Sequence, residues 1–310
     1  MQKRILVTGA GGFLGSHICQ YFGNKGHTIA AVGRFSAAPE MTAQYLNVWK
    51  FCGMTLPDKT FTKVVRDFQP NLLVHCAGTS SVPESILEPY SDFQRTVEVC
   101  AFTLEITRRE APGCKFILIS SASVYGNPTV LPISKTMPCN PISPYGYHKR
   151  MCEILVDEYS FLHGISAAIL RIFSAYGERL HKQVIFDLCR KFADPQTGGV
   201  EVYGTGKESR DFIHAQDVAR AIECIYNCDA TGYFNLASGT EKYICEVVQL
   251  IKETYGSKKD IIFSGHVRPG DPLRWQADIS DLKSLGFKPQ VTLAKGIKKY
   301  CAWFKNYYKI

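Results

Sequence analysis

The stretch Thr8-Gly9-Ala10-Gly11-Gly12-Phe13-Leu14-Gly15 carries four glycines near the start of the chain. It stands between the apolar run Ile5-Leu6-Val7, typical of a strand, and a helical pattern that continues to Phe22. Glycines at G-x-x-G-x-x-G spacing permit a tight turn and let backbone N–H groups approach a pyrophosphate, which then rests on the helix N-terminus. Such patterns also occur in ordinary turns, but the strand before and the helix after favour the functional interpretation. The sequence therefore predicts a dinucleotide-binding turn with contacts from Gly9, Gly12, Phe13, Leu14 and Gly15.

The first half of the chain alternates between short apolar runs and helical patterns. The runs that we expect to be strands are Ile5–Val7, Thr28–Val32, Leu72–Val74, Lys115–Ile119 and Ile169–Ile172. Helical patterns cover 61–68, 93–109 and 145–163, and we expect Ile154, Leu155 and Phe161 on the buried side of the last. Strands that are apolar throughout and alternate with amphipathic helices form a parallel sheet covered on both faces. This predicts an α/β protein with a Rossmann-type doubly wound parallel sheet.

The alternation loosens after Arg171. Turn signals stand at 195–199, 203–206 and 269–272. Helices are expected at 216–227, 241–255 and 292–306, the last with Ile297, Trp303 and Phe304 buried. We expect residues 1–171 to form the dinucleotide-binding Rossmann domain. Residues 172–310 would mainly form a smaller C-terminal substrate-binding subdomain, with part of 209–237 returning to the Rossmann unit.

The composition excludes several classes of protein. The chain has 310 residues, of which 45% are hydrophobic and 21% charged, as in globular proteins rather than disordered ones. No run approaches the roughly 20 apolar residues that span a bilayer, so no membrane contact is expected. The net charge of +8 is spread along the chain, and the basic C-terminal stretch fits a solvated helix face better than nucleic-acid binding. The 12 cysteines include no C-x-x-C pair and predict neither a disulfide scaffold nor a metal site, which suits a reducing cytoplasm.

The segment Gly33-Arg34-Phe35-Ser36 bears on the choice of cofactor. An acidic residue at the end of the second strand would bond the ribose hydroxyls of NAD, whereas an arginine there accommodates the 2′-phosphate of NADP. This segment has no acid, and the guanidinium of Arg34 has the fork geometry that grips a phosphate. The alternative is an ordinary exposed arginine. The sequence favours NADP(H) over NAD(H).

Tyr145 and Lys149 lie four residues apart and hence on one face of the predicted helix, which Ser143-Pro144 would begin. A neighbouring ammonium favours the phenolate form of tyrosine, which can take a proton from a sugar hydroxyl while hydride leaves the same carbon. Such pairs are common on helix surfaces, so the pair alone is weak. Ser120-Ser121-Ala122-Ser123 strengthens it, because it directly follows a predicted strand and ligands bind at the carboxyl ends of parallel strands.

With these motifs the chain resembles the extended short-chain dehydrogenases/reductases of the nucleotide-sugar epimerase/dehydratase family. Further matching stretches are His75-Cys76-Ala77-Gly78, Leu170 to Gly177, Arg210-Asp211-Phe212-Ile213-His214 through Asp217, and Arg268-Pro269-Gly270-Asp271. The resemblance implies that Tyr145 is the acid/base, that Lys149 holds the nicotinamide ribose and that Ser121 bonds the sugar oxygen. It adds Ala77, Tyr145 and Lys149 to the cofactor contacts. It also implies a homodimer through helices 93–109 and 145–163, and a nucleotide-diphosphate-sugar site formed by Ser80, Ser123, Ser174, Tyr203, Arg210 and Arg268.

Departures from the family pattern narrow the reaction. Ala122 and Ser123 stand where family 4,6-dehydratases carry Asp-Glu, so water elimination lacks its proton carriers and is disfavoured. Family decarboxylases usually keep that glutamate, and reductases that also epimerise place a cysteine at position 123. Ser174 stands where the family usually has an asparagine beside the substrate phosphate. The stretch Cys52-Gly53-Met54-Thr55 lacks the aspartate that usually follows the glycine and contacts the adenine.

Three functions stay open. The favoured one is a 4-epimerase that holds its dinucleotide tightly and works through a transient 4-keto sugar. The second, supported by Arg34, is an NADPH-dependent nucleotide 4-keto-6-deoxy-sugar reductase. The third is a non-enzymatic dinucleotide sensor, which the fold does not exclude but which the presence of Ser121, Tyr145 and Lys149 disfavours.

Overall fold

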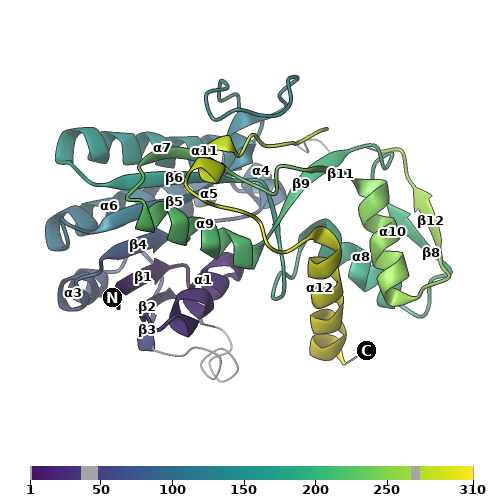
Figure 1. Cartoon of the computed structure of the whole chain (residues 1–310), viewed down its shortest axis with the longest axis horizontal. Coiled ribbons are helices and arrows are strands. Elements are labelled where there is room, and N and C mark those ends of the chain that lie inside the picture. The colour runs from purple at the N-terminus through teal and green to yellow at the C-terminus, as the bar shows by residue number, and fades with distance from the viewer. Residues whose placement is uncertain (1, 36–47, 267–272, 310) are drawn as a thin grey trace.

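A seven-stranded parallel sheet forms the centre of the larger part of the molecule (Figure 1). The computed structural model describes residues 2–35, 48–266 and 273–309. In spatial order the strands are β10 (Gly232–Leu236), β6 (Ala167–Ile172), β5 (Lys115–Ser121), β4 (Leu72–His75), β1 (Arg4–Thr8), β2 (Thr28–Gly33) and β3 (Val48–Gly53). Every neighbouring pair is parallel. The strand order reverses between β1 and β4, which is where open α/β sheets bind their ligands.

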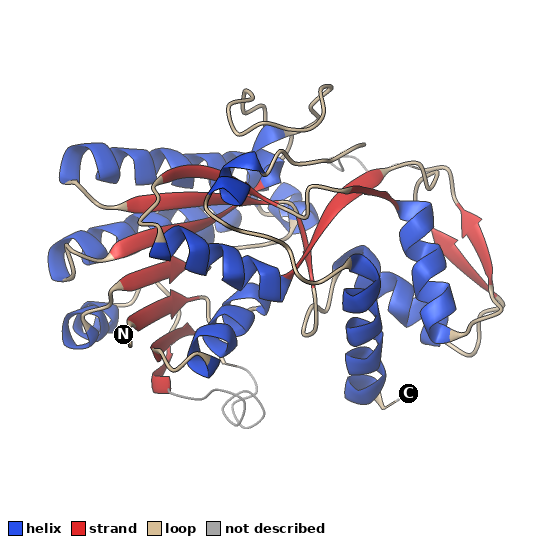
Figure 2. Ribbon diagram, viewed as in Figure 1, coloured by secondary structure: helices blue, strands red, loops and turns tan. Residues whose placement is uncertain are grey.

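Helices cover both faces of this sheet (Figure 2). One face carries α1 (Phe13–Asn24), α9 (Ala215–Asn227) and α11 (Ser280–Ser284), whose apolar side chains share a core with β1, β5 and β6. The other face carries α3 (Thr60–Phe68), α6 (Val99–Glu110) and α7 (Pro144–His163). The chain also forms two short helices, α4 (Val82–Leu87) and α5 (Pro89–Phe93), a π-helical turn η1 (Gln94–Glu98) and a 3₁₀ turn η2 (Ala122–Tyr125). The predicted Rossmann-type fold is confirmed.

A smaller part with its own apolar core lies at the right of Figure 1. Its strands form a three-stranded sheet of β7 (Ser174–Tyr176), β9 (Ser209–His214) and β11 (Glu241–Tyr243), and a two-stranded sheet of β8 (Gly199–Val202) and β12 (Asp260–Phe263). Its helices are α8 (Gln183–Ala193), α10 (Ile244–Tyr255) and α12 (Leu293–Tyr308). The chain enters this part after β6 and returns to the large sheet at β10.

Three expectations need correction. Ile154 and Phe161 are 51% and 89% exposed rather than buried, and only Leu155 of that trio packs against the core. Trp303 is partly buried, whereas Ile297 and Phe304 are fully buried as predicted. The helix expected at 241–255 begins at Ile244, because the three residues before it pair with β9 as a strand. The sequence pattern did not indicate α8, and the turn expected at 269–272 lies outside the described residues.

Candidate active site

The glycine turn links β1 to α1 and packs closely against its neighbours. A Cβ atom at Gly15 would lie 2.3 Å from the carbonyl oxygen of Gly9, and one at Gly11 would lie 2.0 Å from that of Arg34. Gly9 has a φ of 67°, and a Cβ there would meet the backbone of Cys76 at 2.7 Å. Only glycine fits these three positions, since a side chain would clash with the backbone after β2 at Gly11, with the backbone after β4 at Gly9, and with the turn itself at Gly15.

The start of α1 leaves backbone donors available at this turn. Its N-cap is Gly12, which has no side chain to bond the first-turn N–H groups, and no acidic residue occupies the first turn. The first N–H groups of a helix have no partner within the helix and favour an anion. The glycine cradle and these donors together fit the pyrophosphate of a dinucleotide.

Tyr145 and Lys149 lie in the first two turns of α7. Ser143 caps this helix, its hydroxyl accepting a hydrogen bond from Gly146 N at 3.2 Å, and Pro144 occupies the first helical position. Lys149 is buried, and its ammonium donates to the carbonyl oxygen of Ile119 at 3.1 Å. The ammonium lies 5.9 Å from the centre of the Tyr145 ring. The helix therefore holds both predicted residues at the carboxyl end of β5.

The charge on Lys149 is set by opposing effects. Burial alone would lower the pKa of its ammonium, but attraction to Tyr145 and nearby thiols outweighs this, and the pKa lies above its usual value. Lys149 is therefore positively charged at neutral pH. A buried cation beside a phenol stabilises the negative charge that the phenol acquires when it gives up its proton.

Two serine hydroxyls lie beside the first turn of α7. Ser121 ends β5, and its hydroxyl accepts a hydrogen bond from Ser123 N at 3.2 Å. The Ser123 carbonyl approaches Gly146 so closely that a Cβ there would lie 2.7 Å from its oxygen. The Ser123 hydroxyl is buried and has no hydrogen-bond partner within the described chain. The structure thus brings Ser121, Ser123, Tyr145 and Lys149 together, and leaves one buried hydroxyl available to a ligand.

A buried ion pair fixes the elements beneath these residues. The guanidinium of Arg171, on β6, donates to both carboxylate oxygens of Glu153, on α7, at 2.9 and 3.0 Å. The hydroxyl of Ser120 donates to the same carboxylate at 2.7 Å. Arg171 also donates to the hydroxyl of Tyr125 at 2.9 Å. The network ties α7 to the strand ends that carry Ser121, so that the candidate catalytic groups keep a fixed relation.

The remaining predicted cofactor contacts lie around the glycine turn. Ala77 follows β4, and its N–H donates to the hydroxyl of Thr8 at 3.3 Å. That hydroxyl is also 3.0 Å from His75 Nδ1. Arg34 follows β2 and is exposed. Together with the glycine turn, these residues lie along the carboxyl ends of β1, β2 and β4.

The predicted substrate contacts come from both parts of the molecule. Ser80 is exposed in the loop after β4. Ser174 begins β7, just after Ile172, whose strand position pairs with Ser121. The Arg210 guanidinium, on β9, lies 5.8 Å from the Trp275 ring. Tyr203 follows β8 and is 50% exposed. Arg268 lies outside the described residues.

Lys182 is a residue at this site that sequence reasoning missed. It precedes α8 in the smaller part, and its ammonium donates to the carbonyl oxygen and hydroxyl of Ser80 at 2.7 and 2.6 Å. The two residues stand 102 positions apart. No motif in the sequence connects them, so only the fold could bring this lysine to the predicted site.

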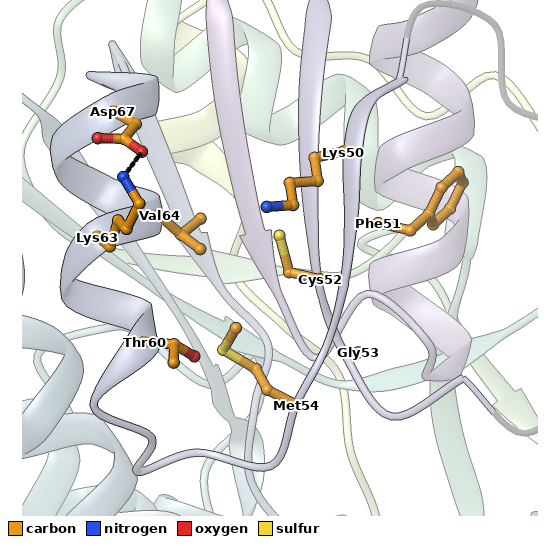
Figure 3. Close-up of a pocket in the computed structure, with 9 residues that line it drawn as sticks. All are labelled: Lys50, Phe51, Cys52, Gly53, Met54, Thr60, Lys63, Val64 and Asp67. Atoms are coloured by element: carbon orange, nitrogen blue, oxygen red, sulfur yellow. Dashed lines mark hydrogen bonds and ion pairs between the residues drawn. The ribbon is translucent and has the colours of Figure 1, made fainter.

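Two surface cavities lie away from these residues. One of about 280 Å³ lies between β3 and α3 at the sheet edge (Figure 3). Lys50 and Cys52 point toward it from the strand, and Lys63 forms an ion pair with Asp67 at 2.7 Å on the helix. The other, of about 410 Å³, lies at the amino ends of the strands, around Lys115 and Asp229. Neither contains a predicted catalytic residue.

Within the described ranges 2–35, 48–266 and 273–309, no group of three His, Cys, Asp or Glu side chains is arranged to hold a metal ion. None of the helices in these ranges has the length and apolarity needed to cross a bilayer. All 12 cysteines are free thiols.

Comparison with known proteins identifies the class that this fold and site define. The chain belongs to the NAD dependent epimerase/dehydratase family, whose model matches residues 5–237. It is 28% identical over 312 residues to UDP-glucose 4-epimerase of Mycolicibacterium smegmatis, covering 98% of this chain and 99% of the relative.

Two solved structures are similar over nearly their whole length. UDP-N-acetylglucosamine 4-epimerase of Methanobrevibacter ruminantium has 26% identity and a TM-score of 0.89, with 99% of each chain covered. UDP-glucose 4-epimerase of Thermus thermophilus, in complex with NAD, has 25% identity and a TM-score of 0.86, covering 97% of this chain and 99% of that one.

Proposed function

We propose that this protein interconverts nucleotide-diphosphate sugars that differ in configuration at C4, with a bound nicotinamide dinucleotide as cofactor. The observation that carries the proposal is the cluster of Ser121, Tyr145 and Lys149 at the carboxyl end of β5, beside a glycine turn that fits a pyrophosphate. The similar epimerases act on UDP-sugars, which makes a UDP-sugar the first substrate to test.

Each of these three residues has a distinct task in this reaction. Tyr145 takes the proton of the C4 hydroxyl and returns it after the keto sugar has presented its other face. Taking this proton requires the phenolate form of Tyr145, and Lys149 keeps a positive charge beside that phenolate. The Ser121 hydroxyl donates a hydrogen bond to the reacting oxygen and so fixes the position of that oxygen. When bound, the dinucleotide supplies hydride acceptance and return at C4.

The residues after Ser121 make the site unsuited to elimination of water. Ala122 and Ser123 carry no carboxylate, so no acid and base pair stands at the position from which dehydratases of this family remove water. A redox change at one carbon needs only the tyrosine as proton carrier, with the dinucleotide as hydride acceptor. A nucleotide 4-keto-6-deoxy-sugar reductase with NADPH as co-substrate is the second candidate, favoured by Arg34 at the end of β2.

A Tyr145→Phe variant tests the proposal. We expect it to lose about 10²–10⁴-fold in the rate of C4 epimerisation of UDP-glucose, UDP-N-acetylglucosamine or UDP-glucuronate, followed by NMR, because the proton carrier is gone. Dinucleotide binding should persist. Tyr147→Phe is the matched control, since Tyr147 lies on the same helix and is 54% exposed.

The other outcomes separate the alternatives. Stoichiometric oxidation of added NADPH by a 4-keto sugar, with no epimer formed, would favour the reductase. Full biological activity in Tyr145→Phe would favour a non-enzymatic sensor instead.

A further inference from the structure

Lys182 bridges the two parts of the molecule across the predicted site. It stands between β7 and α8 in the smaller part, and its ammonium reaches the loop that follows β4 in the large sheet. Both hydrogen bonds go to one residue, the carbonyl oxygen of Ser80 at 2.7 Å and its hydroxyl at 2.6 Å. An ammonium has three donors, so one remains available.

The charge of Lys182 is not neutralised within the described chain. Its two partners are neutral oxygens, and no carboxylate of the described residues lies within ion-pair distance of the ammonium. Burial lowers the pKa of Lys182, and the attraction of Glu84 offsets this only in part. A half-buried cation that lacks a counter-ion gains most from an anionic ligand.

The loop that Lys182 contacts also supports Tyr145. Ser80 leads into α4, which Ser81 caps by accepting a hydrogen bond from Glu84 N. One turn later, the hydroxyl of Ser85 accepts a hydrogen bond from Tyr145 N at 3.1 Å. The Lys182 ammonium and the start of α7 therefore contact the same short segment, which consists of α4 and the loop residues just before it.

We propose that Lys182 is a substrate-binding residue whose free donor bonds an anionic oxygen of the nucleotide sugar. This rests on the proposed function. The anion can come from two sources on such a substrate, the diphosphate or a carboxylate at C6 of a sugar acid. Only a substrate seated between the loop after β4 and the start of α8 would meet this cation, so Lys182 would also hold the two parts together around it.

Binding measurements on the cofactor-containing protein distinguish the sources. Calorimetric dissociation constants are compared for UDP, UDP-glucose and UDP-glucuronate with the natural protein and Lys182→Met. If the diphosphate is the anion, the variant should bind all three about tenfold or more weakly, the loss expected for a charge-assisted hydrogen bond. If a carboxylate is the anion, UDP-glucuronate alone should show that loss.

Two variants separate charge from structure. Lys182→Arg keeps the cation and should recover most of the affinity that Lys182→Met loses. Lys63→Met removes a lysine of α3 at the edge of the large sheet, one paired with Asp67 at 2.7 Å, and should bind the three ligands like the natural protein.

Binding of all three ligands by Lys182→Met within twofold of the natural protein would overturn the role of Lys182 while leaving the epimerase proposal intact. Failure of the natural protein to bind any of them would overturn both.

Discussion

At the scale of single residues, Arg34 carries the predicted preference for NADP(H). It is exposed directly after β2, where its carbonyl oxygen would lie 2.0 Å from a Cβ at Gly11 of the dinucleotide turn. If its guanidinium grips the 2′-phosphate, Arg34→Ala should weaken NADPH binding by about tenfold or more, or 1.4 kcal/mol, and leave NADH binding unchanged. Fluorescence titration of the dinucleotide-free protein measures both constants.

The control for this titration is an arginine on α6. Arg109→Ala removes an arginine from the far end of α6, where it pairs with Glu105, and should change neither constant. Equal losses for both dinucleotides in Arg34→Ala, or tightly held NAD released only on denaturation, would refute the preference. The NAD complex of the similar Thermus thermophilus enzyme makes this the first titration to run.

The placement of residues that depends on local geometry was predictable. Helix periodicity places Tyr145 and Lys149 on one face of α7, and the apolar strand places the serine stretch 120–123 at its carboxyl end. The choice of Ser121 within that stretch came from the family resemblance. Lys182 was not predictable, because its contact with Ser80 joins segments 102 residues apart and neither segment has a periodic or turn signal for it. The sequence pattern shows where a strand ends, but not which distant loop lies opposite.

At the scale of elements, α7 shows why apolar spacing alone predicts the wrong side of a helix to be buried. Its inner side buries polar groups, among them His148, Lys149 and Glu153, because each finds a partner there. Its outer side exposes Ile154 and Phe161. Prediction from apolar spacing assumes that apolar residues face the core, and it fails where a helix serves a polar site on one side and leaves an apolar surface on the other.

That apolar surface supports the predicted homodimer. Tyr147, Met151, Ile154 and Phe161 of α7 are all at least 40% exposed and recur at helical spacing. Exposed apolar residues that recur at helical spacing are typical of a protein interface. We expect Ile154→Glu to convert a dimer into a monomer in sedimentation velocity, because a carboxylate cannot be buried there without a partner.

Ile262→Glu provides the matched control for this test. Ile262 is a similarly exposed isoleucine on β12, in the other part of the molecule, and its replacement should leave the oligomeric state unchanged. A monomeric natural protein, or a dimer that survives Ile154→Glu, would exclude α7 as the interface.

At the scale of the whole molecule, buried histidines join its layers and its two parts. His75 lies at the centre of the large sheet, stacked on Phe116 with ring centres 5.8 Å apart and with its Nδ1 3.0 Å from the Thr8 hydroxyl. His17, on α1, has its Nε2 2.8 Å from the carbonyl oxygen of Glu178, which lies in the smaller part. The fold must keep both rings out of water, so its stability depends on their remaining neutral.

The protonation of these histidines should make the fold sensitive to acid. Burial, with a smaller contribution from the charge of Lys149, lowers the pKa of His75 to about 3 from an ordinary 6.5. Burial likewise lowers the pKa of His17. Because each folded-state pKa lies below the unfolded one, the unfolded chain binds more protons between pH 6.5 and 3, and the free energy of unfolding falls as the pH drops through that window.

Urea unfolding at pH 8 and pH 5, without added dinucleotide, measures this effect. His75 alone should lower the free energy of unfolding by about 2 kcal/mol at pH 5 relative to pH 8. His75→Asn removes the titrating ring and should reduce the pH dependence by that amount, whatever it does to stability at pH 8. His163→Asn, at the exposed end of α7, should keep the natural pH dependence. An unchanged difference between the two pH values in His75→Asn would show that His75 is already protonated, or water-accessible, in the folded protein.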